Sequence, residues 1–421
     1  MARTEFATAR AAAARAPAGA RAFLGGCTAE PLAILAAVAD DPALWQDIRL
    51  TGAFVPGVND RDFTTLGTRT RVETIFATPG LRGGAAVDHL PLHYSAYWQH
   101  LSRPGQVDVA FVTVPPPGAD WCIGLGLTCD FAPAVIAAGA VLVGVVNPGM
   151  PDIATAPRYP VSRFAALVDG PGALPAYDAG RVDPASARIA DHVLGLLRPG
   201  DTLQLGLGRV QAAVLAALPA SGLRNLGFHG GMISAPIRSA LDQGLFSRGV
   251  TTGVALGDAG FYADLPRHAR IRFQPVGVTH AQATLAAIPR LIAVNTVIEI
   301  DLSGQANAEA RGGRQVSGQG GLVDFLRGAR ASAGGRSVLA LPATAQGGRI
   351  SRIVAALDAG TPVSVARADV DMVVTEHGVA DLADQPLARR AERLIAIAAP
   401  AFRDALSAGW DGLQRGPGPV R

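Results

Sequence analysis

The chain has 421 residues, of which 49% are hydrophobic and 17% charged, fractions that are typical of a globular protein and exclude a disordered one. This length exceeds one ordinary hydrophobic core, so we expect two domains. The net charge is +3 and all 37 basic residues are arginines. They are spread evenly, without the basic run or aromatic-rich basic strip of a nucleic-acid-binding protein.

The cysteines and the apolar segments exclude further classes of protein. Cys27, Cys122 and Cys129 are too few for a disulfide framework and lack the spacing of metal ligands. The longest apolar run, residues 132–146, is interrupted by proline and glycine and is shorter than the roughly 20 residues of a membrane span. We therefore expect a soluble cytoplasmic protein without a metal, a membrane or a nucleic acid as partner.

Short apolar runs alternate with helical stretches along the chain, which is the pattern of parallel βαβ units. The Arg- and Ala-rich residues 1–22 predict an ordinary first helix rather than a transit peptide, because a strand-to-turn segment, "FLGG", follows at once. The expected strands are residues 108–114, 141–146, 202–208, 296–304, 337–343 and 372–378. The expected helices are residues 31–40, 210–219, 350–360 and 387–399.

One arrangement occurs twice in the sequence. Residues 23–38, "FLGGCTAEPLAILAAV", and 203–218, "LQLGLGRVQAAVLAAL", both run from a strand end through a glycine turn into a helix. Such a turn presents free N–H groups to an anion or a carbonyl oxygen, although every α/β fold also needs tight corners. The recurrence predicts two similar α/β halves, which we divide into residues 1–185 and 186–421.

The second half contains a glycine-rich segment, residues 304–329, "GQANAEARGGRQVSGQGGLVDFLRGA". Glycine at this density lets the backbone approach a ligand closely. Its central stretch, Gly318–Gln319–Gly320–Gly321, leads into a helix-like segment. We therefore expect a pocket of backbone N–H groups there for a carbonyl oxygen or a phosphate.

Several long stretches carry a family resemblance. "VIEIDLSGQANAEARGGRQVSGQGGLVDFLRGA", "ALPATAQGGRISRIVAALDAG", "DVDMVVTEHGVADL" and "ERLIAIAAPAFRDAL" together resemble the acetyl-CoA hydrolase/transferase family, in particular its 4-hydroxybutyrate and butyryl CoA-transferases. The first half matches more loosely, through the turn at residues 25–31 and "VVNPGMPDIATAP". The resemblance implies two tandem class I CoA-transferase-like α/β domains with mostly parallel sheets, a site in the cleft between them, and a homo-oligomer.

The resemblance also implies a glutamate nucleophile in a His-x-Glu-Met segment, which attacks the acyl-CoA thioester and becomes a glutamyl-CoA thioester. The matching segment here reads His229–Gly230–Gly231–Met232, so Gly231 occupies the place of the glutamate. No glutamate lies between Glu73 and Glu299, so a shift of one residue cannot restore it. Glycine has no side chain to acylate, and the family's usual mechanism would need a carboxylate from elsewhere.

Other residues of these motifs are candidates for catalysis or binding. His229 is a candidate for polarising a carbonyl or moving a proton, with a structural histidine as an equal alternative. Glu376 and His377 form a possible acid/base pair, whereas Glu309 is interpreted as structural and Cys27 as a buried thiol. The candidates for binding substrate or CoA are Gly206, Gly208, Gly230, Gly231, Met232, Gly318, Gln319, Gly320, Gly321, Pro342 and Thr344.

Three functions follow as hypotheses. In the first, the protein activates an acyl-CoA or related pantetheine thioester for acyl transfer to a second acceptor, cyclisation or hydrolysis, as in specialised biosynthesis. The CoA thioester is then a substrate, and no cofactor is bound tightly. In the second, a relocated carboxylate supports ordinary CoA transfer. In the third, the protein is a non-catalytic acyl-CoA-binding homologue.

Overall fold

The computed structural model of the protein describes residues 6–415. Its first sheet is built around β5 (Val109–Val114) and β7 (Val141–Val146). These largely apolar strands are buried on both faces, except at Val141, as a central parallel strand requires. The sheet has the order β4-β3-β2-β1-β5-β7-β9, and all neighbouring strands are parallel. Its other strands are β1 (Arg21–Leu24), β2 (Arg49–Gly52), β3 (Arg71–Thr74), β4 (Val87–His89) and β9 (Phe164–Asp169).

The second sheet has the order β15-β13-β11-β10-β16-β21-β25-β26, and only β26 runs antiparallel to its neighbour. Its strands are β10 (Thr202–Leu205), β11 (Gly227–His229), β13 (Val250–Thr252), β15 (Ile271–Phe273), β16 (Leu291–Asn295), β21 (Arg336–Ala340), β25 (Met372–Thr375) and β26 (Gly378–Asp381). Small two- and three-stranded sheets join the loops, namely β6 (Cys122–Gly124) with β8 (Arg158–Pro160), β12 (Met232–Ser234) with β14 (Val254–Leu256), β17 (Glu299–Asp301) with β18 (Ala306–Asn307) and β24 (Ile353–Val354), β19 (Ala310–Arg311) with β20 (Arg314–Gln315), and β22 (Thr344–Ala345) with β23 (Ile350–Ser351).

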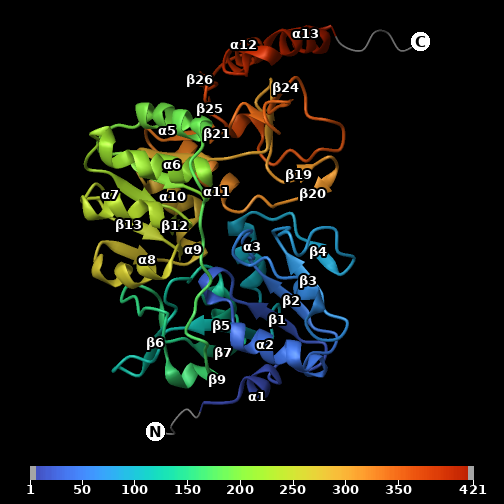
Figure 1. Ribbon diagram of the computed structural model, residues 1–421, viewed down its shortest axis with the longest axis vertical. Helices are drawn as coiled ribbons and strands as arrows, with labels where there is room; N and C mark the ends of the chain where they lie inside the picture. Colours follow the sequence, from blue (N-terminus) through green and yellow to red (C-terminus); the bar gives the residue numbers. More distant parts are fainter. Residues whose placement is uncertain (1–5, 416–421) are drawn as a thin grey trace.

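Helices connect the strands, and the two halves of the chain lie one above the other, with the last two helices projecting beyond the upper half (Figure 1). The first half contains α1 (Ala9–Ala13), α2 (Leu32–Asp40), α3 (Tyr94–Leu101) and α4 (Ala132–Ala137). The second contains α5 (Pro184–Leu196), α6 (Arg209–Ala217), α7 (Arg238–Asp242), α8 (Ala259–Asp264), α9 (Val276–Thr279), α10 (Gln282–Ala287), α11 (Leu322–Ala331), α12 (Leu387–Ala396) and α13 (Arg403–Gln414).

Most of the predicted elements are present. The expected strands at residues 108–114 and 141–146 are β5 and β7, and the expected helices at 31–40, 210–219 and 387–399 are α2, α6 and α12. The strand expected at residues 296–304 is only β17, three residues long, and it belongs to a small sheet rather than to the main one. The first sheet ends at Asp169 and the second begins at Thr202, so the proposed boundary near residue 185 falls between them.

The prediction of a helix over residues 350–360 is wrong. Ile350, Ile353 and Val354 have helical spacing, but the chain forms β23 and β24 there. Ile353 pairs with Ile300 of β17, and the Ile300 N–H donates to the Arg352 carbonyl at 2.9 Å. Pairing with a distant strand satisfies the backbone groups, and this tertiary contact overrides a local periodicity.

One large hydrophobic cluster extends through both halves, from Phe23 of β1 to Val374 of β25. The two halves therefore share a core instead of meeting through a polar surface. Within residues 6–415, every helix is too short or too polar to traverse a lipid bilayer.

Candidate active site

A cavity of about 670 Å³ opens between the two halves, and we call it the cleft. The carboxyl ends of the second-sheet strands β10, β11, β16 and β21 supply one wall, through Gly206, Gly231, Thr296 and Pro342. The first half supplies the opposite wall, which includes Phe76 and Tyr94. Crevices at the carboxyl ends of parallel strands are the usual ligand sites of open α/β sheets.

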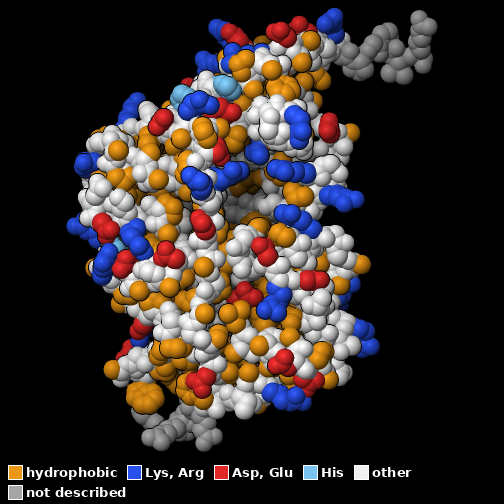
Figure 2. All heavy atoms as spheres, viewed as in Figure 1, with side chains coloured by type: hydrophobic (Ala, Val, Ile, Leu, Met, Phe, Trp, Pro, Cys, Tyr) orange, Lys and Arg blue, Asp and Glu red, His pale blue; other side chains and the backbone are white. Residues whose placement is uncertain are grey.

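The charges that line the cleft are all basic. Four arginines reach it, Arg82, Arg209, Arg311 and Arg352, and none of its lining residues, all of which lie within residues 6–415, is Asp or Glu. Figure 2 shows a hollow at mid-height with basic side chains along its rim. The Arg352 Nε is buried without a hydrogen-bond partner, and burial and the neighbouring Arg311 and Arg209 lower its pKa. These guanidinium groups favour an anionic ligand.

The Gly318–Gly321 segment packs directly on the first half of the chain. A Cβ on Gly318 would lie 1.8 Å from the Ile75 carbonyl oxygen, so only glycine permits this approach. The Tyr94 N–H donates to the Gly320 carbonyl at 3.0 Å, and Gly320 has a φ of +56°. Within residues 6–415, the Gly320 and Gly321 N–H groups have no protein acceptor. The segment therefore offers two free donors at the cleft, at the start of α11.

The other predicted glycine turn lies across the same cleft. Gly206 and Gly208 both line it, and Gly208 adopts a φ of +121° as the residue that precedes α6. This backbone conformation is accessible essentially only to glycine. The structure thus brings together in one cavity most of the predicted binding residues, namely Gly206, Gly208, Gly231, Met232, Gly318, Gln319, Gly320, Gly321 and Pro342.

The space beside Gly231 is filled by a residue that the sequence did not single out. A Cβ on Gly231 would lie 2.9 Å from Cε1 and 3.1 Å from Nε2 of His280, and a Cβ on Gly321 would lie 2.3 Å from the same Nε2. The imidazole of His280 therefore stands between the two glycines and lines the cleft. Neither glycine can gain a side chain without displacing this ring.

His280 lies in the turn between α9 and α10, where its ring packs against two aromatic side chains and its Nδ1 is hydrogen-bonded. The rings of Tyr94 and Phe325 pack against it at centroid distances of 4.9 and 4.5 Å. Nδ1 lies 2.8 Å from the Thr279 hydroxyl oxygen, and only 1% of the residue is exposed. Burial lowers the pKa of His280 to about 3, with the carboxylate of Asp324 opposing this shift, so the ring is neutral at physiological pH.

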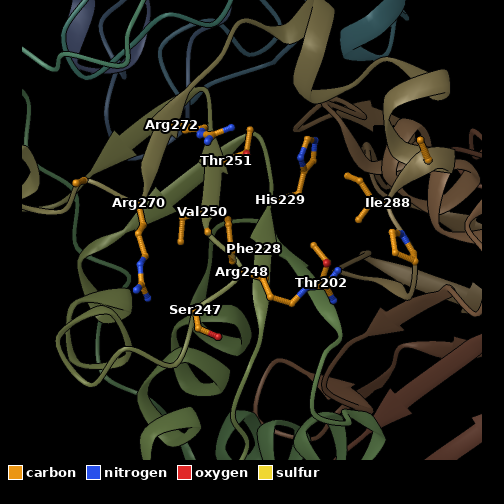
Figure 3. A pocket seen from close by; sticks show the side chains of 15 residues that line it. Thr202, Phe228, His229, Ser247, Arg248, Val250, Thr251, Arg270, Arg272 and Ile288 are labelled. Atoms are coloured by element: carbon orange, nitrogen blue, oxygen red, sulfur yellow. The ribbon is translucent and has the colours of Figure 1, made fainter.

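His229, the predicted catalytic histidine, does not line the cleft. Its Nε2–H donates to the Thr279 carbonyl at 3.0 Å, and burial lowers its pKa. The ring faces a second cavity of about 530 Å³, where it lies near Thr251 and Arg272 (Figure 3). The hydrogen bond from Nε2 anchors Thr279, the residue that precedes His280.

The remaining candidates also lie outside the cleft lining. Glu376 accepts a hydrogen bond from the Ala343 N–H at 2.8 Å, which fixes the loop after Pro342, and His377 lies 3.9 Å from the Glu376 carboxylate. Thr344 pairs with Ser351 in β22 and β23, and the Gly230 N–H donates to the Thr251 carbonyl. The predicted acid/base pair therefore lies beside the loop of Pro342 and Thr344, but outside the lining of the cleft.

Two further residues considered from the sequence are buried elsewhere. Glu309 is 4% exposed and does not line the cleft. Cys27 is 1% exposed, and burial raises the pKa of its thiol well above its ordinary value. A thiol in this state is a poor nucleophile, as the interpretation of Cys27 as a buried thiol anticipates.

Comparison with known proteins places the chain in a family. Residues 257–409 match the acetyl-CoA hydrolase/transferase C-terminal domain. The chain is 31% identical over 308 residues to the 4-hydroxybutyrate coenzyme A transferase of Clostridium kluyveri, and the alignment covers 71% of each protein. The chain belongs to the acetyl-CoA hydrolase/transferase family. The resemblance seen in the sequence is therefore confirmed.

Solved structures extend the similarity over nearly the whole chain. RipA from Yersinia pestis has a TM-score of 0.91 at 26% identity and covers 97% of this chain and 98% of its own. The 4-hydroxybutyrate CoA-transferase from Porphyromonas gingivalis has a TM-score of 0.78 at 28% identity and covers 98% of both chains. This acetyl-CoA hydrolase/transferase family member therefore has the predicted CoA-transferase fold.

Proposed function

We propose that the protein binds an acyl-CoA, or a related pantetheine thioester, in the cleft and activates its carbonyl without a glutamyl-CoA intermediate. As a member of its family it is an enzyme of the CoA-thioester transferase or hydrolase type. The proposed outcome is transfer of the acyl group to a second acceptor, cyclisation or hydrolysis. The observation that carries the proposal is Gly231, which offers no nucleophile in a cleft whose lining contains no carboxylate.

The charges and donors of the cleft support a CoA thioester as the ligand. CoA carries several phosphate charges, and the four arginines provide cationic groups for them without a competing acid in the lining. The free N–H groups of Gly320 and Gly321 are suited to the thioester oxygen. Such donors stabilise the negative charge that develops there when the carbonyl is attacked.

A relocated carboxylate has less support in the geometry. Glu376 lies next to the loop at Pro342, but its carboxylate already accepts from the Ala343 N–H. Glu309 is buried behind Ala308 and Arg311, which line the cleft while it does not. Either acid would have to leave its position to reach a thioester beside Gly231.

The test is a survey of thioester consumption. Purified protein is incubated with a panel of short acyl-CoAs, alone and with acetate, amines or alcohols, and free CoA thiol and acyl products are measured. We expect thiol release, and we expect no loss of activity on borohydride treatment in the presence of acyl-CoA. Consumption of none of the thioesters would contradict the proposal.

The borohydride step separates the proposed chemistry from ordinary CoA transfer. Borohydride reduces a glutamyl or aspartyl thioester, which leaves a mass change on one acidic residue. Detection of that change by peptide mass spectrometry would show that a relocated carboxylate acts, and the reaction without a carboxylate intermediate would then be wrong.

A further inference from the structure

The orientation of the His280 ring identifies which nitrogen faces the ligand. Nε2 is the atom that closely approaches both Gly231 and Gly321, whereas Nδ1 contacts the Thr279 hydroxyl at 2.8 Å. Gly231, Gly321 and His280 all line the cleft. Nε2 is therefore the ring nitrogen that lies beside the free N–H groups of the Gly318–Gly321 segment.

The hydrogen bonds of Thr279 assign the ring proton. The Thr279 hydroxyl donates to the Pro275 carbonyl at 3.3 Å, and a hydroxyl has only one hydrogen to give. We therefore assign the ring proton to Nδ1, which donates to the Thr279 oxygen, and the lone pair to Nε2. Within residues 6–415, no protein group bonds to Nε2. A neutral imidazole thus presents an unprotonated nitrogen to the cleft.

We propose that His280 is the nucleophile of this enzyme and forms an acyl-imidazole at Nε2, in the place that a glutamate at position 231 would otherwise use. The inference rests on the function proposed above and names the residue that carries it. The argument is geometric, because Nε2 of His280 lies beside the empty position and beside the two donors for the oxyanion.

The proposed step balances as a double displacement. The Nε2 lone pair attacks the thioester carbon, the N–C bond forms, and the C–S bond breaks with its electron pair leaving on the CoA thiolate. The acyl-imidazolium keeps the Nδ1 proton that it donates to Thr279. Burial disfavours its positive charge, and the Asp324 carboxylate offsets part of that cost. The acceptor then attacks the acyl carbon, the C–N bond breaks with its electron pair returning to Nε2, and the acceptor proton passes to the thiolate.

The packing around the His280 ring holds the proposed nucleophile in one position. Tyr94 and Phe325 hold the imidazole plane, and the hydrogen bond from His229 to the Thr279 carbonyl fixes the preceding residue. The nucleophile is therefore preorganised rather than mobile, which is the condition for efficient attack. Tyr94 belongs to the first half of the chain and Phe325 to α11, so both halves position it.

The test uses the full-length protein and an acyl-CoA that it consumes. After rapid acid quench, peptide mass spectrometry should find the mass of the acyl group on the peptide that contains His280, with a burst of about one CoA thiol per site. His280→Gln should lower the rate of thiol release at least about 100-fold while acyl-CoA binding, measured by calorimetry, is retained. His268→Gln, an equivalent change outside both cavities, should leave the rate unchanged.

The possible results distinguish the two proposals. If the wild-type enzyme releases thiol but carries no acyl group on His280, or if His280→Gln retains the wild-type rate, His280 is not the nucleophile although the proposed function stands. If no acyl-CoA is consumed by the wild-type protein, the proposed function itself fails. The adduct is sought on the wild-type enzyme, so the test does not depend on the folding of a variant.

Discussion

At the scale of single residues, His229 and His280 lie in the same region but have different roles. His229 belongs to the motif that the sequence identifies, but its Nε2 donates to the Thr279 carbonyl. His280 belongs to no recognised motif, yet it occupies the space beside Gly231. Proximity in sequence to the missing glutamate was therefore a weaker guide to the candidate catalytic histidine than proximity in space.

The burial of His280 predicts a pH dependence of stability. Its pKa is about 3 in the folded chain and about 6.5 when unfolded. Above pH 6.5 both states are neutral and stability is unaffected. As pH falls below 6.5, only the unfolded state gains the proton, so by pH 5 the fold should lose about 2 kcal/mol through this group. The groups nearby that act on it are Asp324, His229 and His93.

The measurement is the melting temperature between pH 7 and pH 5 for the wild type and His280→Gln. The variant should lose less stability over this range. Asp130 provides a control of opposite sign, because burial raises the pKa of its carboxyl to about 6. Asp130→Asn should steepen the loss on acidification, since the wild-type carboxyl takes up a proton in the folded state first. Parallel curves for the wild type and His280→Gln would contradict the burial of a neutral ring.

At the scale of elements, the glycine turns define the walls of the cleft. The turn before α6 needs glycine at position 208 for its backbone conformation, whereas Gly321 before α11 has an ordinary φ of −87°. Gly321 is therefore required for space and not for conformation, because a Cβ there would contact His280 Nε2. The start of α11 therefore packs closely against the turn between α9 and α10, where Gly321 meets His280.

This fit predicts coupling between two substitutions. Gly321→Ala should destabilise the protein by about 1–3 kcal/mol through overpacking against His280. In Gly321→Ala/His280→Ala the added methyl group no longer meets the imidazole, and the remaining close neighbour is Cε2 of Phe325 at 3.1 Å. The double variant should therefore be more stable than the sum of the single effects. Urea denaturation of the four proteins measures this coupling. Additive effects would show that the two elements do not compete for this space.

At the scale of the whole molecule, the shared core joins the two α/β halves. The large cluster that includes Phe23 and Val374 crosses the division near residue 185. Polar contacts reinforce it, because the Ser95 hydroxyl and N–H both donate to the buried Asp324 carboxylate, at 2.7 and 3.0 Å. The division into residues 1–185 and 186–421 describes topology, and we propose that it does not describe two independently stable units.

A split chain tests this proposal. Residues 1–185 and 186–421 produced separately should each expose apolar surface, bind a hydrophobic dye and lack a sharp thermal transition. Mixed or co-expressed, they should recover the compact protein, and the intact chain should melt in one calorimetric transition. A sharp transition in either fragment alone would show that the half is a stable domain.

The sequence by itself determined the fold family and the loss of the glutamate. Alternating apolar runs and glycine turns predicted the parallel strands β5, β7 and β10 and the helices α2 and α6, because these signals are local. The long motifs in register predicted the family. Gly231 was visible because an absent side chain in a known motif can be read directly from the residues.

Only the tertiary structure decided what replaces the glutamate. His280 lies 49 residues after Gly231 in the sequence, and no local pattern links a turn between two short helices to the end of β11. The strand pairing at Ile353 was hidden for the same reason, since its partner is in β17. Contacts between distant segments depend on how the sheets stack, so a site shared by several loops is defined only when the chain is folded.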